Sequence, residues 1–319
     1  MSVARTLDAA PGIVAIDTLM FGREDATSAY LIRADEPALV ETGSTTCVPA
    51  VREGLASLGV GPNDLAHIVV THIHLDHAGG AGSLAPHFPR ATVWVHERGA
   101  PHLADPTRLM ESAARIYGEE RLIELFGPVE PIPEERLRAL TDGDRVDLGG
   151  DRALEVLYTP GHASHHVALL DSHSGGIFVG DALGVFLPDV RILRPATPPP
   201  EFDLEQATAS IGRILEREPS SILFSHFGPA REVAHLCRLA TRRLERWTSV
   251  VEEALETTQE TAAVVEALRE GTRGELNPAE EEGRRAVADR YELLSSYEMN
   301  TLGIMRYLRK RGEAAEKTG

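Results

Sequence analysis

The feature that most constrains this chain is residues 71–77 (THIHLDH), which place three histidines and one aspartate within six positions. The apolar residues 68–70 precede this stretch and predict a short buried strand. The small residues 78–82 follow it and predict a sharp turn. We therefore expect these side chains to lie on a loop at the carboxyl end of a strand, where functional groups tend to gather.

The spacing of these residues indicates metal binding. On an extended segment, residues two apart point the same way, so His72 and His74 can reach one point together. Asp76 and His77 turn off that line and can reach a second point nearby. Imidazole nitrogens with a carboxylate oxygen suit zinc, and also iron and manganese. The alternative is a polar surface loop rich in histidine, which is disfavoured because the whole chain has 13 histidines in 319 residues.

The overall charge narrows the class of partner. The chain carries 32 Lys and Arg against 49 Asp and Glu, a net charge of −17, which argues against nucleic acid and against anionic membrane surfaces. Its two cysteines, Cys47 and Cys237, lack a close pairing and suit a reducing compartment. The sequence shows neither a signal-peptide core nor a membrane-spanning run. We expect a cytoplasmic protein with a small-molecule substrate, and a homodimer is left open.

The pattern along the chain predicts an α+β fold in two regions. Short strands separated by turns continue to residue 225, and helices are expected at 48–58 and at 204–216, the second with Asp203 as its N-cap. Residues 187–200 hold five prolines and are expected to form an extended surface connection. Helical spacing without strand signals then follows. We therefore expect a catalytic domain at 1–228 and an all-helical region at 229–319.

Three further ligand-type residues repeat the pattern of the opening stretch. His162 in TPGH, Asp181 in GDAL and His226 in SHFG are each the first ligand-type residue after an apolar run. Each therefore stands at the end of a predicted strand, where it can converge with the others. The repetition is a stronger signal than any single histidine.

With these residues in view, the sequence resembles the metallo-β-lactamase-fold hydrolases. The motifs HIHLDH, TPGH, GDAL and SHFG match that family in order and spacing over about residues 12–230. The resemblance implies a four-layer αββα sandwich with a dinuclear site at one edge of the two sheets. The full set resembles glyoxalase II, ribonuclease Z and the lactonases, whereas the lactamases typically lack a bridging aspartate. The implied ligands are His72, His74 and His162 for one metal, Asp76, His77 and His226 for the other, and Asp181 between them.

The same resemblance implies a reaction. Two divalent ions, with zinc favoured and manganese or iron as alternatives, would hold a hydroxide that attacks the substrate. Asp181 would bridge the ions, and Asp76 would orient the nucleophile or carry a proton. The leading hypothesis is a hydrolase of a small ester, thioester or lactone. The alternatives are a phosphodiesterase or phosphotriesterase, and a persulfide dioxygenase with one iron.

Several residues are expected to support this site. Glu41 stands where much of the family has an aspartate, and we expect its carboxylate to hydrogen-bond a ligand histidine; a surface acid is the alternative. His102 and Tyr117, in the insert at 97–126, and Tyr297, in the C-terminal helices, are candidates for the substrate pocket. Helix packing is the alternative for all three. His165 is expected to be solvated rather than a ligand.

Overall fold

A computed structural model describes residues 4–275 and 281–318. The chain forms two compact units that interleave along the sequence. Unit 1 comprises Met1–Tyr158, His165–Gly180 and Pro219–Arg231, and unit 2 comprises Thr159–Ser164, Asp181–Glu218 and Glu232–Gly319. The predicted domain boundary at residue 228 lies near the end of unit 1 and stays a prediction, since two earlier segments belong to unit 2.

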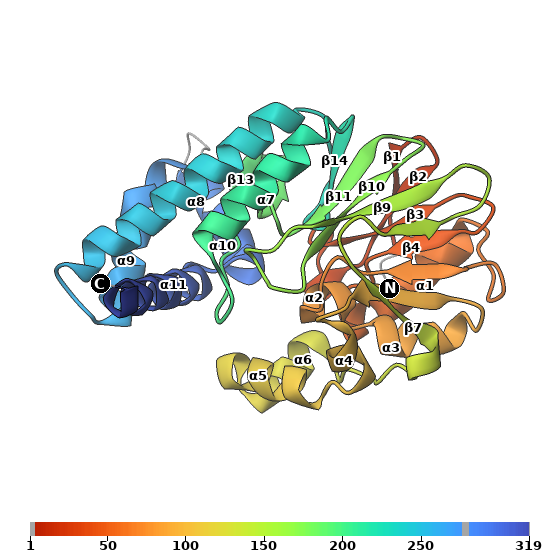
Figure 1. Ribbon diagram of the computed structural model, residues 1–319, viewed down its shortest axis with the longest axis horizontal. Coiled ribbons are helices and arrows are strands. Elements are labelled where there is room, and N and C mark those ends of the chain that lie inside the picture. Colours follow the sequence, from red (N-terminus) through yellow and green to blue (C-terminus); the bar gives the residue numbers. More distant parts are fainter. Residues whose placement is uncertain (1–3, 276–280, 319) are drawn as a thin grey trace. The chain divides into compact units, whose positions relative to one another are not determined.

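The first sheet of unit 1 has seven strands that lie in chain order (Figure 1). Neighbouring strands are antiparallel from β1 to β4 and parallel from β4 to β7. The strands are β1 (Thr6–Ala10), β2 (Ile13–Asp17), β3 (Ser28–Ile32), β4 (Ala38–Val40), β5 (His67–Val69), β6 (Thr92–His96) and β7 (Leu137–Leu140).

The second sheet of unit 1 has six strands in the order β15-β14-β11-β10-β9-β8. Strand β10 runs antiparallel to both β9 and β11, and β11 runs parallel to β14. The carboxyl ends of β9, β11 and β14 therefore lie at the same edge of this sheet. The strands are β8 (Arg145–Asp147), β9 (Ala153–Tyr158), β10 (Val167–Asp171), β11 (Gly176–Gly180), β14 (Ser221–Phe224) and β15 (Gly228–Ala230).

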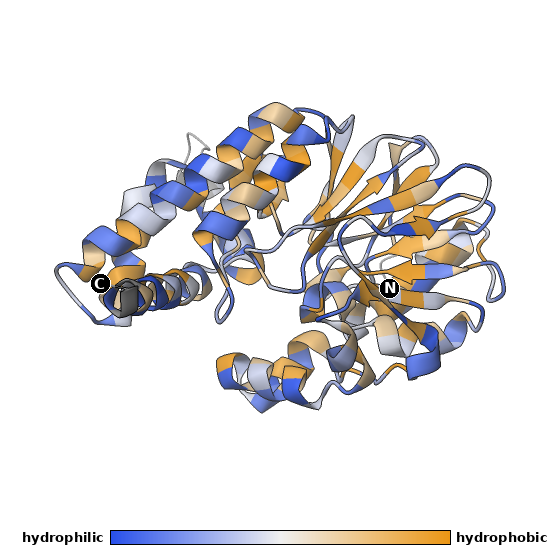
Figure 2. Cartoon of the chain, viewed as in Figure 1, coloured by the Kyte–Doolittle hydropathy of each residue, from blue (hydrophilic) through white to orange (hydrophobic). Residues whose placement is uncertain are grey.

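The two sheets bury a common core, which explains why their strands read as continuous apolar runs. Tyr30 and Ile32 of β3 belong to a buried cluster with Phe178 of β11 and Leu223 of β14. Residues one position along a strand face the opposite way, and Leu31 accordingly packs on the far face, in the cluster that includes α1 (Val48–Ser57). Figure 2 shows the apolar colour concentrated on these strands.

The remaining helices of unit 1 lie after β5 and β6, as the sequence predicts for the insert at 97–126. They are α2 (Leu75–Ala78), α3 (Ala81–Leu84), α4 (Ala100–Ala104), α5 (Thr107–Tyr117) and α6 (Glu119–Phe126). The predicted helix at 48–58 is confirmed as α1. The sequence does not predict strand β15, because its three residues include Pro229, which argues against a strand. The proline is tolerated because β15 is the edge strand of its sheet and pairs with β14.

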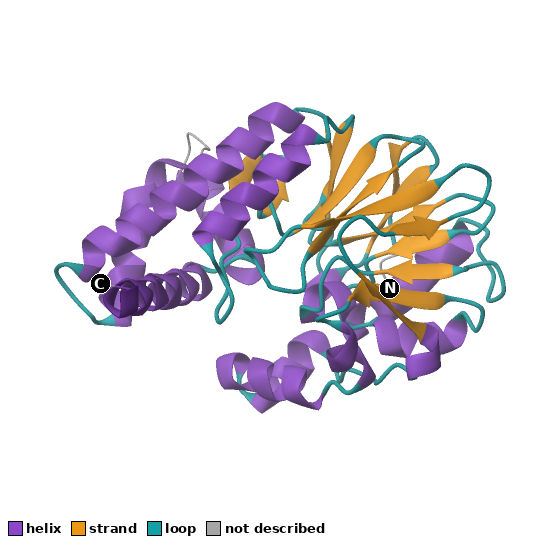
Figure 3. Ribbon diagram, viewed as in Figure 1, coloured by secondary structure: helices purple, strands orange, loops and turns teal. Residues whose placement is uncertain are grey.

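Unit 2 is mainly helical (Figure 3). Its helices are α7 (Leu204–Glu216), α8 (Val233–Leu255), α9 (Thr261–Thr272), α10 (Glu281–Leu294) and α11 (Tyr297–Thr318). The predicted N-cap of α7 is confirmed, because the Asp203 carboxylate accepts a hydrogen bond from the Gln206 N–H at 2.9 Å. None of the helices in the described part of the chain is both long and apolar enough to cross a bilayer.

The predicted surface connection at 187–200 is wrong in its first half. Strands β12 (Val185–Leu187) and β13 (Ile192–Arg194) form an antiparallel hairpin there. Both strands are buried, and their apolar side chains pack against Val287 and Tyr291 of α10. The proline content misled the prediction, because Pro188 lies in the turn of the hairpin and the other prolines follow its second strand.

Candidate metal centre

The residues at 71–77 lie where the two sheets of unit 1 meet. His72 and His74 follow the end of β5, and Asp76 and His77 lie in the short helix α2. Backbone hydrogen bonds fix this loop to both sheets. The Val167 N–H donates to the Thr71 carbonyl at 2.8 Å, and the Thr42 N–H donates to the His77 carbonyl at 2.9 Å. The loop is thus anchored at both of its ends.

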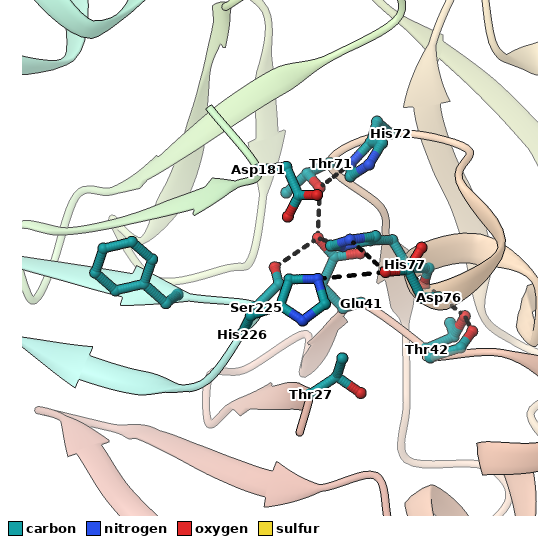
Figure 4. A network of polar contacts seen from close by, with 12 residues as sticks. Thr27, Glu41, Thr42, Thr71, His72, Asp76, His77, Asp181, Ser225 and His226 are labelled. Carbon is teal, nitrogen blue, oxygen red and sulfur yellow. Dashed lines mark hydrogen bonds and ion pairs between the residues drawn. The ribbon is translucent and has the colours of Figure 1, made fainter. Parts of the chain in front are cut away.

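Three of the predicted ligand atoms converge within unit 1 (Figure 4). The Asp76 Oδ2 atom lies 3.4 Å from His77 Nε2 and 3.3 Å from His226 Nε2. His226 comes two residues after the end of β14, so the second sheet supplies it. Tetrahedral zinc with metal–ligand bonds of about 2.0–2.1 Å sets its ligand atoms about 3.3–3.4 Å apart. Both the chemistry and the spacing of these three groups therefore fit a bound metal ion.

Hydrogen bonds to Nδ1 of His226 and of His72 determine which nitrogen of each ring is left to bind a metal. The His226 Nδ1–H donates to the Ala26 carbonyl at 3.2 Å, because a carbonyl can only accept. The Thr71 hydroxyl donates its one hydrogen to the Glu41 carboxylate, so it accepts from His72 Nδ1 at 3.0 Å. In both rings Nδ1 therefore carries a proton, so Nε2 is the nitrogen whose lone pair would be available to a metal.

Glu41 connects these contacts. The side chain is 2% exposed, and its Oε1 atom accepts hydrogen bonds from Thr71 and, at 3.2 Å, from the Ser225 hydroxyl. The same oxygen lies 3.5 Å from His77 Nδ1. Glu41 is therefore a buried acid beside His77 and not a surface one, and it reaches His72 through Thr71; its role behind metal ligands stays a prediction. Sequence reasoning missed Thr71 and Ser225, although each directly precedes a ligand-type histidine.

The Asp76 carboxyl group, a member of this cluster, has a shifted pKa. Burial acts to raise the pKa of Asp76, but the positive charge of His77 and the hydrogen bonds that His226 and His77 donate to the carboxylate outweigh it and hold that pKa well below its ordinary value. Asp76 is therefore an ionised carboxylate in the absence of metal.

The expectation that His165 is solvated is wrong: the side chain is 8% exposed, and its Nδ1 accepts a hydrogen bond from the Ile73 N–H at 3.4 Å.

The other two predicted ligands belong to unit 2. His162 Nε2 lies 3.5 Å from Asp181 Oδ2, and the His162 Nδ1–H donates to the Ala196 carbonyl at 2.9 Å. Asp181 directly follows Gly180, the last residue of β11, and His162 lies four residues after β9. The covalent chain thus brings both to the carboxyl ends of parallel strands. Their joining the ligands of unit 1 in one seven-residue set stays a prediction.

The three pocket candidates differ in their surroundings. Tyr117 is half-buried at the end of α5, with its ring 5.3 Å from that of Phe126. Burial, and secondly the negative charge of Asp76, raise the pKa of Tyr117 to about 12, so the hydroxyl lies within electrostatic reach of the ligand cluster. His102 is half-buried in α4, and its role stays a prediction.

Tyr297 has the contacts expected of a packing residue. It is 2% exposed, its ring stacks on Trp247 at 5.3 Å, and the Arg194 guanidinium lies 3.7 Å above it. The Tyr297 hydroxyl lies 3.1 Å from that of Thr272. All of these contacts are within the helical core of unit 2, so helix packing accounts for this residue, and a role in the pocket stays a prediction without support from them.

Sequence comparisons place these observations in a family context. Residues 22–226 match the family model described as the Metallo-beta-lactamase superfamily. The chain is 32% identical over 168 residues to a metallo-beta-lactamase fold-containing protein of Sulfurisphaera tokodaii, covering 51% of this chain and 61% of that protein. It is 32% identical over 155 residues to a hydroxyacylglutathione hydrolase of Aeromonas hydrophila, covering 48% and 45%. The chain thus spans about half the length of these curated relatives.

Solved structures share the fold over nearly the whole chain. A metallo-beta-lactamase family protein of Thermus thermophilus superposes with a TM-score of 0.67 at 23% identity, covering 95% of this chain and 94% of that one. An archaeal metallo-beta-lactamase superfamily protein from Sulfolobus tokodaii gives 0.63 at 20% identity, covering 96% and 99%. These likenesses confirm the predicted α+β sandwich fold with C-terminal helices.

Proposed function

The chain belongs to the metallo-beta-lactamase superfamily, and from this premise we propose that it is a metal-dependent hydrolase of small molecules. The observation that carries the proposal is the convergence of Asp76, His77 and His226: the Asp76 carboxylate lies 3.4 Å and 3.3 Å from the two rings, and the three ligand atoms lie within 4.8 Å of one another. Outer hydrogen bonds orient the ring of His226 toward that point, and the carboxylate of Glu41 lies behind the ring of His77. Groups held in this way bind a cation without first having to rearrange.

We extend the proposal to two divalent ions, with zinc favoured and manganese or iron as alternatives. His162 and Asp181 form a second ligand-type pair at 3.5 Å, and His72 and His74 supply two more imidazoles. Bound there, such ions would lower the pKa of water toward about 7 and polarise the substrate oxygen. Asp76 is ionised before any ion binds, so its carboxylate is available to orient the attacking water or to accept its proton.

The proposed substrate is a small ester, thioester or lactone. One relative bears the name hydroxyacylglutathione hydrolase, and another, in Bacillus subtilis, is named a probable metallo-hydrolase. The net charge of −17 disfavours a polyanionic substrate such as nucleic acid. Tyr117, a neutral phenol within the field of Asp76, is the residue that we place beside the substrate.

Metal analysis combined with a panel of lactones, thioesters, carboxylic esters and phosphate esters tests this proposal. We expect about two zinc or manganese ions per chain and hydrolysis within the first three substrate classes. One iron per chain with oxygen uptake on glutathione persulfide would overturn it, and activity confined to phosphate esters would overturn the substrate class.

The bridging role of Asp181 needs its own variant. We expect Asp181→Ala to lose metal and activity together, whereas the exposed Asp147→Ala, on β8, keeps both. Retention of two ions by Asp181→Ala would show that this carboxylate is not the bridge.

A further inference from the structure

A buried asparagine in the last helix of unit 2 holds a short segment of main chain. Asn300 is 1% exposed and lies in the first turn of α11. Its Oδ1 atom accepts hydrogen bonds from both the backbone N–H and the hydroxyl of Thr197, each at 2.7 Å. Thr197 lies three residues beyond the end of β13 and is itself 1% exposed. The side chain thus fixes residue 197 at two points.

The other half of the same amide is equally engaged. Asn300 Nδ2 donates to the Ser295 hydroxyl and to the Ser296 carbonyl, both at 2.8 Å. The Ser295 hydroxyl in turn donates to the Pro195 carbonyl at 2.6 Å. A flipped amide would turn its NH2 group against the Thr197 N–H, so the orientation of Asn300 is determined. Residues 195 and 197 are therefore both held, and Ala196 lies between them.

The carbonyl of Ala196 is the partner of a predicted ligand. It accepts the His162 Nδ1–H at 2.9 Å, and His162 is 5% exposed. Since a carbonyl has no proton to give, this bond keeps the ring in the tautomer that presents Nε2. That nitrogen is the atom that lies 3.5 Å from Asp181. Outer partners of this kind set both the tautomer and the direction of a metal-binding histidine.

We propose that Asn300, assisted by Ser295, is a positioning residue for the metal centre. By fixing residues 195–197 it aims the Ala196 carbonyl at His162, and so sets which nitrogen of that ring faces the metal. The inference rests on the proposed function in so far as His162 is taken to be a ligand. It gives the helical region a part in metal binding that involves no contact between α11 and an ion.

Two variants and one matched control test the proposal. Asn300→Ala removes all four bonds of the amide, and the smaller change Ser295→Ala removes the hold on Pro195. Thr301→Val alters the neighbouring residue of α11, which is 0% exposed but has no hydrogen bond to residues 195–197 among the bonds described for this chain. All three changes are at buried side chains between residues 295 and 301, whereas only the first two remove side-chain hydrogen bonds to the segment 195–197.

The first measurement needs no metal. In metal-free protein with labelled histidine, the nitrogen spectrum reports the tautomer of His162, assigned by comparison with His162→Ala. We expect a fixed Nδ1–H form in the parent and in Thr301→Val, and a mixture of tautomers in Asn300→Ala and Ser295→Ala. An unchanged Nδ1–H form in both would overturn the inference.

The second measurement is zinc affinity, by competition with a chromophoric chelator. We expect Asn300→Ala to weaken binding about tenfold, the low end of the range for outer-partner changes, and Thr301→Val to leave it unchanged. A lower melting temperature with unaltered affinity would mean a merely structural role and would overturn the inference. Unaltered zinc binding by His162→Ala would instead refute His162 as a ligand; that failure of the proposed function is distinguishable, because the tautomer measurement is made without metal and does not depend on it.

Discussion

At the residue scale, one carboxylate contacts the candidate metal centre of unit 1 on the side away from the converging ligand atoms. Glu41 holds the hydroxyls that precede His72 and His226, and it lies 3.5 Å from the ring of His77. These contacts reach the loops of both sheets. A neutral amide at this position would retain the size of the side chain but would lose the charge that strengthens hydrogen bonds to it.

We accordingly expect Glu41→Gln to weaken metal binding by about 10- to 100-fold, the range typical of outer partners of metal ligands. Equilibrium dialysis against a chelator measures the change, and Glu36→Gln, at a side chain 48% exposed, serves as the control. Equal affinity in the two variants would show that Glu41 does not orient the ligands.

The pKa of a second residue, Asp17, determines part of the way in which the stability of the fold depends on pH. Asp17, at the end of β2, accepts hydrogen bonds from the Leu19 and Asp25 N–H groups. Burial raises the pKa of Asp17 to about 6; the Leu19 hydrogen bond and Arg5 act to lower it, and Glu24 acts to raise it. Between the unfolded pKa of about 3.9 and this value, the folded chain binds more protons than the unfolded chain.

This raised pKa means that the Asp17 contribution to stability is greatest below pH 4 and falls as the pH rises to about 6. We expect the difference in melting temperature between Asp17→Asn and the parent to shift in favour of the variant over that interval. Thermal melts at half-unit pH steps measure it. The exposed Asp8→Asn should follow the parent curve, and a parallel curve for Asp17→Asn would refute the assignment.

At the scale of elements, the end of β11 depends on a glycine. Gly180 has a φ of +47°, and a Cβ atom there would lie 2.5 Å from both Thr71 Oγ1 and His166 Nε2. Thr71 is the residue that links Glu41 to His72. The absence of a side chain at position 180 therefore allows β11 to approach the loop at residues 71–77 closely.

Gly180→Ala should destabilise the fold by about 1–3 kcal/mol through overpacking, and should lower the metal content by displacing Thr71. Urea denaturation and metal analysis measure the two effects. Gly212→Ala is a matched control, because position 212 in α7 has open space around it. A helical alanine there should be neutral or up to about 1 kcal/mol stabilising. Similar results for the two variants would contradict the steric argument.

The same scale shows what sequence reasoning can reach. Helix α7 was predicted to its residue bounds, because Asp203 gives a cap signal and the following residues have a clear helical period. The loop at residues 71–77 was predicted because its histidines and aspartate directly follow an apolar run. The hairpin β12–β13 was missed, since its burial depends on Tyr291, about a hundred residues away. The contacts of Asn300 could not be predicted either, because they too join residues about a hundred positions apart in the sequence.

At the scale of the whole molecule, a bound ion would connect the two sheets of unit 1. Asp76 and His77 follow a strand of the first sheet, and His226 follows a strand of the second. An ion that binds the folded chain but not the unfolded chain stabilises the folded state, by about 2.7 kcal/mol when the free ion concentration is 100 times Kd. Metal should therefore raise the melting temperature of the protein.

We expect a strong chelator to lower the melting temperature reversibly, and added zinc to restore it. Differential scanning calorimetry with and without chelator measures the shift. In His226→Ala the shift should be much smaller, because one of the three converging ligands is missing. A parent protein that melts at the same temperature in both conditions would argue against a metal at this point.

The interleaving of the two units also bears on how such a protein can change over evolutionary time. The chain passes between them five times, and two of the passages flank the segment that carries His162. No single crossover between genes could therefore exchange one intact unit for another. New substrate ranges would have to arise by point substitution and by loop insertion, because recombination would separate His162, the proposed ligand, from α11, the helix that we propose positions it.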